Sequence, residues 1–468
     1  LEKRITRLEE RQEQLLKKST TGVTFENLGL DMLLIDEAHE YKNLGLPSNI
    51  EGFQVEPSKR ATDLEMKLRW LEKQGKGPFG AFFTATPLSN NMVEAYVVAW
   101  FLDQQRLLAY GLNSVDAFVA NFIDISSEVE VSPDGSTFRM KSRPRSFFNI
   151  VDFLEMFAQF ADIQTSDILD DKRPRREDIT VAVDASPEML DSVASLVKRA
   201  DDLRAGKHTY HGDKEDNMLR IVHEGRELAV SPRQVGILTG PSPKVEAVAA
   251  KMIEIYQRWQ RYPVKLPGEF NSLQIGFCDL CTPSAEKGDQ VYGELKRALI
   301  DGGIPEYGIR YIHEANNDAA KAELFTQCRN GEVAILLGST AKLGTGTNVQ
   351  YRCAAIHLIA QPWRPADVEQ CIGRGHRPGN RFTGMQIYRY VARKTFDAYM
   401  WQALERKSHF IHQLMGGKVT GREIDARGEL ELNYAEVKAA ATGDPLILEQ
   451  AATDMEVARL QRLAKMFF

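Results

Sequence analysis

Short apolar runs alternate with longer stretches of helical composition along most of this chain. The apolar runs occupy residues 32–35, 81–83, 273–278, 333–337 and 355–360, and a further short strand is expected around 310–312. Predicted helices between and after them cover residues 62–73, 244–260, 289–301, 317–329 and 395–415. Runs this short and this uniformly apolar are typical of strands buried on both faces. The alternation therefore predicts an α/β fold with open parallel sheets, whose ligands meet the carboxyl ends of the strands.

The size and composition of the chain restrict its class. A chain of 468 residues is too long for one core, so we expect two or three domains. No apolar stretch is long enough to cross a membrane, and no membrane partner is expected. Five cysteines in apolar surroundings favour a reducing compartment, which places the protein in the cytoplasm. The net charge of −6 neither supports nor excludes nucleic acid, because gripping a backbone needs only local basic patches.

Changes in pattern predict four parts. We assign residues 1–165 to a first lobe, 166–235 to a helical bridge, 236–415 to a second lobe and 416–468 to a helical C-terminal extension. Residues 100–230 interrupt the alternation and read as rich in helix, with a Pro-Asp-Gly turn at 133–135. The chain opens on an amphipathic helix of roughly 18 residues and does not start with methionine, so we expect a fragment.

An acidic pair follows the first apolar run. Asp36 and Glu37 come directly after residues 32–35 and open the stretch Asp-Glu-Ala-His. Nucleotide hydrolysis needs a hard cation and an oriented water. Asp36 is suited to hold Mg²⁺, and Glu37 to orient or activate the attacking water. The alternative is a solvated strand end, which the context of this pair disfavours.

A pair of arginines lies near the other end of the chain. Arg374 and Arg377 stand three residues apart and are predicted to share one face of a helix. The arginine fork keeps its charge and meets phosphate oxygens with two hydrogen bonds. Gln370 lies one turn earlier, and Gly373 permits close backbone approach. The alternative is that the arginines form ion pairs on the surface, and the presence of Gln370 and Gly373 disfavours it.

Weaker signals lie between these motifs. Thr84-Ala85-Thr86 offers hydroxyls that could couple a metal site to another lobe, and the loop 338–348 can present N–H groups to a DNA phosphate. Cys278 and Cys281 form one CxxC, which fits packing at a strand end or a metal or redox role. Basic clusters at 141–145 and 172–176 fit either solvated loops or nucleic-acid contacts.

Taken together, these motifs resemble the superfamily 2 helicase-like ATPases, and within them the Swi/Snf-type translocases on double-stranded DNA. Asp-Glu-Ala-His-Glu-Tyr-Lys-Asn at 36–43 is similar to that group's DEAH motif. Residues 84–91 with Glu94 resemble its TGTP motif, with alanine in place of glycine. Residues 344–348 correspond to its glycine-rich motif, and 363–379 match its W-x-P to R-x-H-R signature.

The resemblance implies two RecA-like lobes with helical insertions, ATP and Mg²⁺ as cofactors, and roles for individual residues. Metal contacts fall to Asp36 and Glu37, and catalysis to Glu37, Gln370, Arg374 and Arg377. Nucleotide contacts are assigned to Asp36, His39, Gly346, Arg374 and Arg377. Contacts to double-stranded DNA are assigned to Thr84, Asn90, Ser339, Thr340, Lys342, Thr345, Asn348 and Trp363.

A narrower resemblance covers almost the whole chain. Residues 338–350, 389–407 and 435–445 are similar to segments of large phage and plasmid proteins that join an adenine-specific DNA methylase to a helicase. Those proteins are associated with antirestriction. No NPPY-type methylase motif occurs here, so a methyltransferase domain would lie elsewhere in the polypeptide. The resemblance implies a bacterial host cell, or a phage or plasmid carried by one.

One departure from the family pattern matters for activity. The phosphate-binding loop that ends in Gly-Lys-Ser/Thr is absent from the sequence, and a strand, loop and helix of this kind need roughly 30 residues or more. We therefore expect the first lobe to be incomplete at its N-terminus. Either the longer protein supplies this loop, which we favour, or this piece cannot hydrolyse ATP by itself.

Three functions remain open: a DNA translocase driven by ATP, a non-hydrolysing DNA-binding or assembly scaffold, and an RNA or strand-separating helicase. The sequence favours the first. It requires the acidic pair at 36–37 and the arginine pair at 374 and 377 to face each other across one nucleotide cleft.

Overall fold

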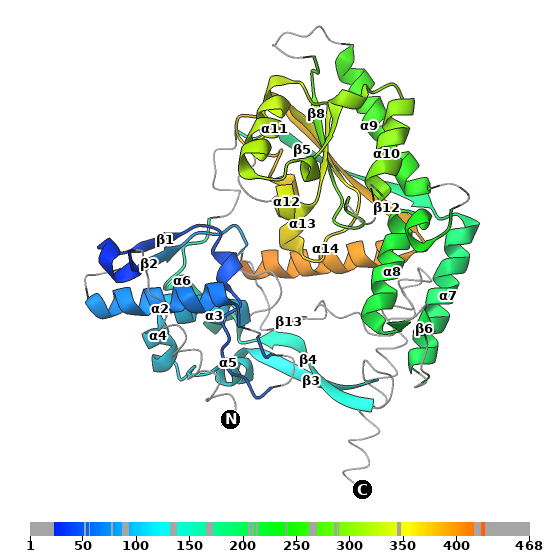
Figure 1. Ribbon diagram of the computed structural model, residues 1–468. Coiled ribbons are helices and arrows are strands. Elements are labelled where there is room, and N and C mark those ends of the chain that lie inside the picture. Colours follow the sequence, from blue (N-terminus) through cyan, green and yellow to red (C-terminus); the bar gives the residue numbers. More distant parts are fainter. Residues whose placement is uncertain are drawn as a thin grey trace. The chain divides into compact units, whose positions relative to one another are not determined.

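The computed structural model of the chain describes residues 23–50, 53–55, 57–75, 78–86, 93–131, 138–164, 172–204, 207, 210–211, 214–238, 240, 242–261, 269–284, 288, 290–343, 348–415 and 423–425 (Figure 1). It divides into two compact units. The N-terminal unit comprises Leu1–Phe122 and Glu155–Ala161, and the C-terminal unit comprises Ile123–Leu154 and Asp162–Phe468. The predicted helix at the start of the chain and most of the predicted C-terminal extension lie outside the described residues.

The N-terminal unit contains a short parallel sheet. Its elements are η1 (Phe25–Leu28), β1 (Leu33–Ile35), η2 (Ala38–Tyr41), α2 (Lys59–Gln74), β2 (Gly80–Phe82), α3 (Val93–Leu102), α4 (Gln104–Ala109) and α5 (Val115–Phe122). Strands β1 and β2 pair in parallel, with Ile35 opposite Phe82. Ser58 caps α2, since its side chain accepts a hydrogen bond from the Ala61 N–H, and Gly75 ends the helix at positive φ. The two predicted strands are therefore confirmed within a residue.

The C-terminal unit is built on a six-stranded sheet in which every pairing is parallel. The strand order is β5-β12-β11-β8-β10-β9. The strands are β5 (Arg175–Asp184), β8 (Leu273–Phe277), β9 (Ile309–Tyr311), β10 (Ile335–Gly338), β11 (Cys353–Leu358) and β12 (Gly384–Arg393). Strands β8, β10 and β11 are buried along their whole length. These strands confirm the predicted α/β class with a parallel sheet.

Helices cover both faces of this sheet (Figure 1). The helices of this unit include α7 (Pro187–Arg204), α8 (Met218–Val230), α9 (Pro243–Gln260), α10 (Gln290–Asp301), α11 (Asp318–Asn330), α12 (Thr340–Leu343), α13 (Pro365–Ile372) and α14 (Phe396–Met415). Ile335 and Leu337 pack into one core with α9 and α10, and Leu336 packs into another with α11 and α13. Alternate residues of one strand thus enter opposite layers. None of the helices in the described part of the chain is long and apolar enough to span a membrane.

Residues 100–230 are rich in helix, as predicted, but they also contain strands that the prediction did not include. A hairpin of β3 (Ile123–Val131) and β4 (Phe138–Phe148) lies on either side of the predicted turn, which is itself outside the described residues. Helix α6 (Ile150–Ala158) follows, and β13 (Glu423–Asp425) pairs with β4. The short strands β6 (Tyr210–His211) and β7 (Lys214–Glu215) also pair. Strand β5 joins the edge of the large sheet next to β12, so part of the predicted bridge belongs to that sheet.

Candidate functional site

The acidic motif forms the turn that follows β1. Glu37 has φ 51°, in the left-handed region that non-glycine residues rarely adopt. Its N–H donates to Asp36 Oδ1 at 2.8 Å, and the Ala38 N–H donates to the Phe83 carbonyl at 3.0 Å. These bonds hold a tight change of direction from strand to η2. As a result, the exposed Asp36 carboxylate stands at the carboxyl end of β1.

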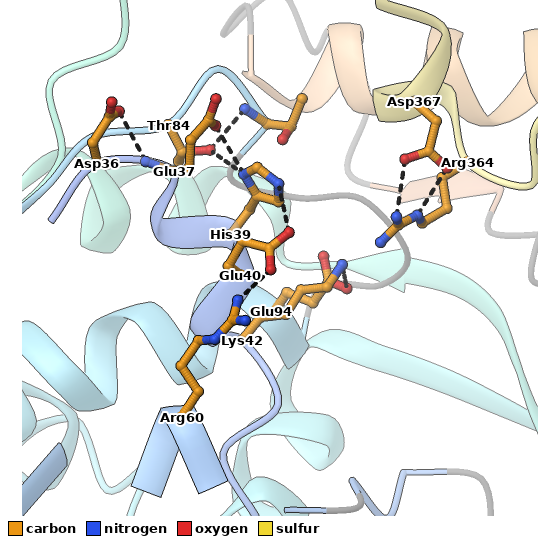
Figure 2. A network of polar contacts seen from close by, with 11 residues as sticks. Asp36, Glu37, His39, Glu40, Lys42, Arg60, Thr84, Glu94, Arg364 and Asp367 are labelled. Atoms are coloured by element: carbon orange, nitrogen blue, oxygen red, sulfur yellow. Dashed lines mark hydrogen bonds and ion pairs between the residues drawn. The ribbon is translucent and has the colours of Figure 1, made fainter. Parts of the chain in front are cut away.

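His39 connects the acidic turn to the end of the neighbouring strand. Its Nδ1 lies 3.3 Å from Glu37 Oε2 and 3.3 Å from Thr84 Oγ1, as Figure 2 shows. Thr84 Oγ1 also accepts the Thr86 N–H at 3.1 Å. With Glu37 ionised, a proton on Nδ1 allows His39 to donate toward both oxygens. The carboxylate, the imidazole and the hydroxyl thus form one polar chain across the ends of β1 and β2.

A buried ion pair fixes the segment after η2. Lys42 Nζ lies 2.8 Å from Glu94 Oε1, and the two side chains are only 9% and 8% exposed (Figure 2). Glu94 belongs to the first turn of α3. Because buried charges are retained only when they are paired, this contact holds the DEAH segment against the helix that follows the TATP segment.

The prediction that both arginines lie on one helical face is wrong. Helix α13 ends at Ile372, and Arg374 and Arg377 lie in the irregular turn that follows. Gly375 lies so close to the sheet that a Cβ there would be 2.6 Å from Cys353 Sγ, and Gly379 has φ 85°. Gly375, Pro378 and Gly379 therefore favour an irregular turn over a continuation of α13. Arg374 is buried and Arg377 exposed, whereas Gln370 is half-buried on α13 itself.

The segment after β10 is bound to the end of β8. Asp279 Oδ1 accepts the Thr340 N–H at 2.6 Å, and Asp279 Oδ2 accepts the Thr340 hydroxyl at 2.7 Å. That hydroxyl also lies 3.3 Å from Cys371 Sγ on α13. Ser339 and Thr340 are buried, so their hydroxyls lie inside the unit and not on its surface. The arrangement connects the ends of two adjacent strands with α13.

The other predicted DNA-contacting residues have different surroundings. Lys342 and Asn348 are exposed, and the Asn348 carbonyl accepts a hydrogen bond from Arg329 Nη1 at 3.0 Å. Trp363 is half-buried in the loop between β11 and α13. The positions of Asn90, Thr345 and Gly346 lie outside the described residues.

Two residues of this site were missed by the sequence analysis. Asp279 follows an apolar strand just as Asp36 does, and that pattern could have identified it. Arg226 lies on the buried side of α8, beside Val222 and Ala229. An arginine at an apolar position of a helix is a weak signal that the sequence analysis did not use. Cys278 is buried directly before Asp279, and this burial raises the pKa of its thiol to about 12, which fits packing at a strand end.

The groups that the structure brings together fall into two sets. Glu37, His39 and Thr84 meet in the N-terminal unit. Thr340, Asp279 and Cys371 meet in the C-terminal unit. That the acidic pair and the arginine pair face each other across one cleft stays a prediction.

Two regions of the chain are similar to known protein families. Residues 1–165 match the family model "Probable helicase domain", and residues 277–379 match "Helicase conserved C-terminal domain". Defense against restriction protein B of Escherichia phage P1 is 23% identical over 276 residues, which are 59% of this chain and 11% of that protein. The chain thus matches only a small part of this curated relative's length.

A similarity is also found among solved structures. The crystal structure of the C-terminal part of the Fun30 ATPase domain aligns with a TM-score of 0.35 and 9% identity, covering 53% of this chain and 100% of that one. The two family models and the phage relative confirm the predicted resemblance. The chain therefore carries one region similar to a helicase domain and a second region similar to a helicase conserved C-terminal domain.

Proposed function

We propose that this chain forms the motor part of an ATP-driven translocase on double-stranded DNA. The observation that carries the proposal is the polar chain from Glu37 through His39 to Thr84, at the carboxyl ends of two adjacent parallel strands. Ligands of open α/β sheets bind at such ends. The match to two helicase family models supports a nucleotide and a nucleic acid as these ligands.

The acidic turn fits a magnesium nucleotide. Magnesium in phosphate-binding sites usually takes one or two carboxylates, with phosphate and water oxygens completing its shell. The exposed Asp36 matches this requirement, and the described residues contain no cluster of three or more acidic, histidine or cysteine side chains that could hold the ion alone. When bound, the ion neutralises phosphate charge. Glu37, oriented by His39, would hold the attacking water and receive its proton.

The turn that carries Arg374 and Arg377, called the arginine turn below, would supply positive charge to the phosphates. Arg374 and Arg377 would contact the phosphates as nucleotide is enclosed, with Gln370 beside them on α13. A turn held by close glycine packing suits this purpose, because a guanidinium that is already positioned loses little freedom on binding. Exposed Lys342 and Asn348 are the described residues best placed to contact a DNA backbone.

The test replaces Glu37 by glutamine in the protein that carries this chain. We expect ATP and duplex DNA still to bind, while DNA-stimulated hydrolysis falls on the order of 10²-fold or more, because the group that accepts the proton is lost. Glu72→Gln is the matched control, since Glu72 is a carboxylate of α2 in the same unit that pairs with Arg69. Turnover in Glu37→Gln equal to that of the control would remove Glu37 from the mechanism.

The same assay separates the competing functions. Duplex DNA should stimulate hydrolysis more than single strands or RNA. Stronger stimulation by single strands or RNA would favour a strand-separating helicase. DNA binding without any ATP hydrolysis in the unsubstituted protein would favour the scaffold.

A further inference from the structure

Arg226 lies under the loop that carries Trp363. Its guanidinium carbon is 3.9 Å from the centre of the Trp363 ring, and its Nη2 donates to the Gln361 carbonyl at 2.7 Å. The Arg226 side chain is only 2% exposed. One buried cation therefore contacts both the backbone and the aromatic ring of the same loop, and a desolvated contact of this kind is stronger than an exposed one.

The helix that carries Arg226 is itself firmly held. A Cβ at Gly225 would lie 2.6 Å from the Phe396 ring, so α8 packs against the start of α14 as closely as a glycine allows. At the other end of α8, the Asn217 side chain caps the helix. Arg199 of α7 pairs with Asp216 and Glu224. These contacts leave little freedom for α8 to shift along its axis.

Charges around Arg226 keep it ionised. Burial lowers the pKa of Arg226 to about 10, while Asp279 and Asp397 raise it, so the guanidinium stays charged at neutral pH. Asp397 accepts the Ala392 N–H at 2.9 Å and pairs with Lys244. Three buried charged residues from three helices, Arg226, Lys244 and Asp397, thus lie near the loop that follows β11.

The loop and the arginine turn are anchored independently. Residues 359–364 connect β11 with α13, and Arg226 contacts their middle. Helix α13 is held by Val368, Cys371 and Ile372 in the core beneath the sheet, and by the contact from Cys371 to Thr340. A change at Arg226 should therefore disturb the Trp363 ring while leaving Arg374 and Arg377 in place.

We propose that Arg226 is a positioning residue that holds the Trp363 ring and its loop for contact with double-stranded DNA. The inference rests on the proposed translocase function. Helix α8 lies outside every motif of the sequence. The inference assigns to this helix an effect on the affinity of the C-terminal unit for duplex DNA. Arg226 itself contacts neither DNA nor nucleotide, and it acts through Trp363.

The experiment compares Arg226→Met, Arg226→Lys, Trp363→Ala and the double variant Arg226→Met/Trp363→Ala. We expect Arg226→Met to raise the duplex concentration for half-maximal ATPase stimulation by about tenfold, while the rates without DNA and at saturating DNA are kept. Arg226→Lys should share the defect, because an ammonium lacks the flat face that stacks on indole. The double variant should be no worse than Trp363→Ala alone, since both changes remove one contact.

Arg389→Met is the matched control. Arg389 on β12 also lies over a tryptophan, Trp401, at 5.9 Å, and it forms an ion pair with Asp178, but neither of these partners belongs to residues 359–364. We expect no change in its DNA dependence. The fluorescence difference between the unsubstituted protein and Trp363→Phe isolates one of the five tryptophans, and Arg226→Met should alter that difference without any DNA.

The outcomes are separable. If Trp363→Ala weakens DNA binding and folded Arg226→Met and Arg226→Lys do not, the positioning role is wrong and the motor stands. Additive defects in the double variant would also overturn it. If duplex DNA neither binds nor stimulates the unsubstituted protein, the proposed function fails, and the inference fails with it.

Discussion

At the residue scale, two buried ion pairs join residues that are distant in the sequence. Lys42 meets Glu94 across 52 positions (94 − 42), and Lys244 meets Asp397 across 153 (397 − 244). The motif resemblance included Lys42 and Glu94, but nothing in the sequence indicated that they form a pair. A pairing of this kind follows from how two elements pack, which a linear pattern does not contain.

We expect Lys42→Met to destabilise the N-terminal unit by about 3 kcal/mol, because one charge of a buried pair is left behind. Lys42→Met/Glu94→Leu should recover much of that loss, since the uncompensated charge is removed. Urea unfolding of both variants measures the difference. The exposed pair of Lys67 and Asp63 provides the control, and Lys67→Met should cost less than about 1 kcal/mol. Equal losses at the two lysines would contradict the buried role.

At the element scale, apolar strands were predictable and mixed strands were not. Strands β8, β10 and β11 lie inside the sheet and are apolar or small almost throughout, so their sequence alone identifies them. Strands β5 and β12 also carry charged residues, such as Asp178 and Arg389, which pair across the two strands. Their apolar residues, Ile179 and Val181 among them, follow a period of two that the charges obscure.

Helix packing gives a prediction at the same scale. Gly225→Ala should destabilise the C-terminal unit by about 1–3 kcal/mol, because the added methyl group would overlap the Phe396 ring. Combining it with Phe396→Leu should cost less than the sum of the two changes, as the smaller side chain makes room.

Thermal unfolding provides the readout for these helix variants. Gly384→Ala is the matched control, since its Cβ would meet nothing nearer than the Arg175 carbonyl at 3.9 Å. A Gly225→Ala variant as stable as Gly384→Ala would show that α8 and α14 can separate.

At the scale of the whole molecule, the strand order of the large sheet assembles the site. Strand β8 lies between β10 and β11, so the segments that follow these three strands end at one edge of the sheet. These segments carry Asp279, Thr340 and the Trp363 loop. Asp279 and Trp363 thus meet at one edge although they lie about 80 residues apart in the sequence. The same sheet buries His357 completely, with Nδ1 2.8 Å from the Tyr390 hydroxyl and Nε2 3.0 Å from Gln274 Oε1.

This burial predicts an acid-sensitive C-terminal unit. Burial lowers the pKa of His357 from 6.5 to about 3, and burial followed by the charge of Lys342 lowers that of His313 to about 4. Between these values and 6.5 the unfolded chain binds the additional protons, so stability falls as the pH falls through this window. His357→Gln should make the unfolding free energy less dependent on pH between 6.5 and 4. Replacing the exposed His223 should leave this pH dependence unchanged. Equal slopes of unfolding free energy against pH in the two variants would contradict the assignment to His357.

The sequence by itself determined the α/β class, the apolar strands of the large sheet, and the motifs at both ends of the chain. These features are local, because an apolar run or a short motif carries its own signal. Tertiary structure decided that Arg374 and Arg377 leave the helix, that the Thr340 hydroxyl faces Asp279, and that Arg226 lies under Trp363. Each of these depends on which surfaces meet when the elements pack, and close packing allows only one arrangement of neighbours.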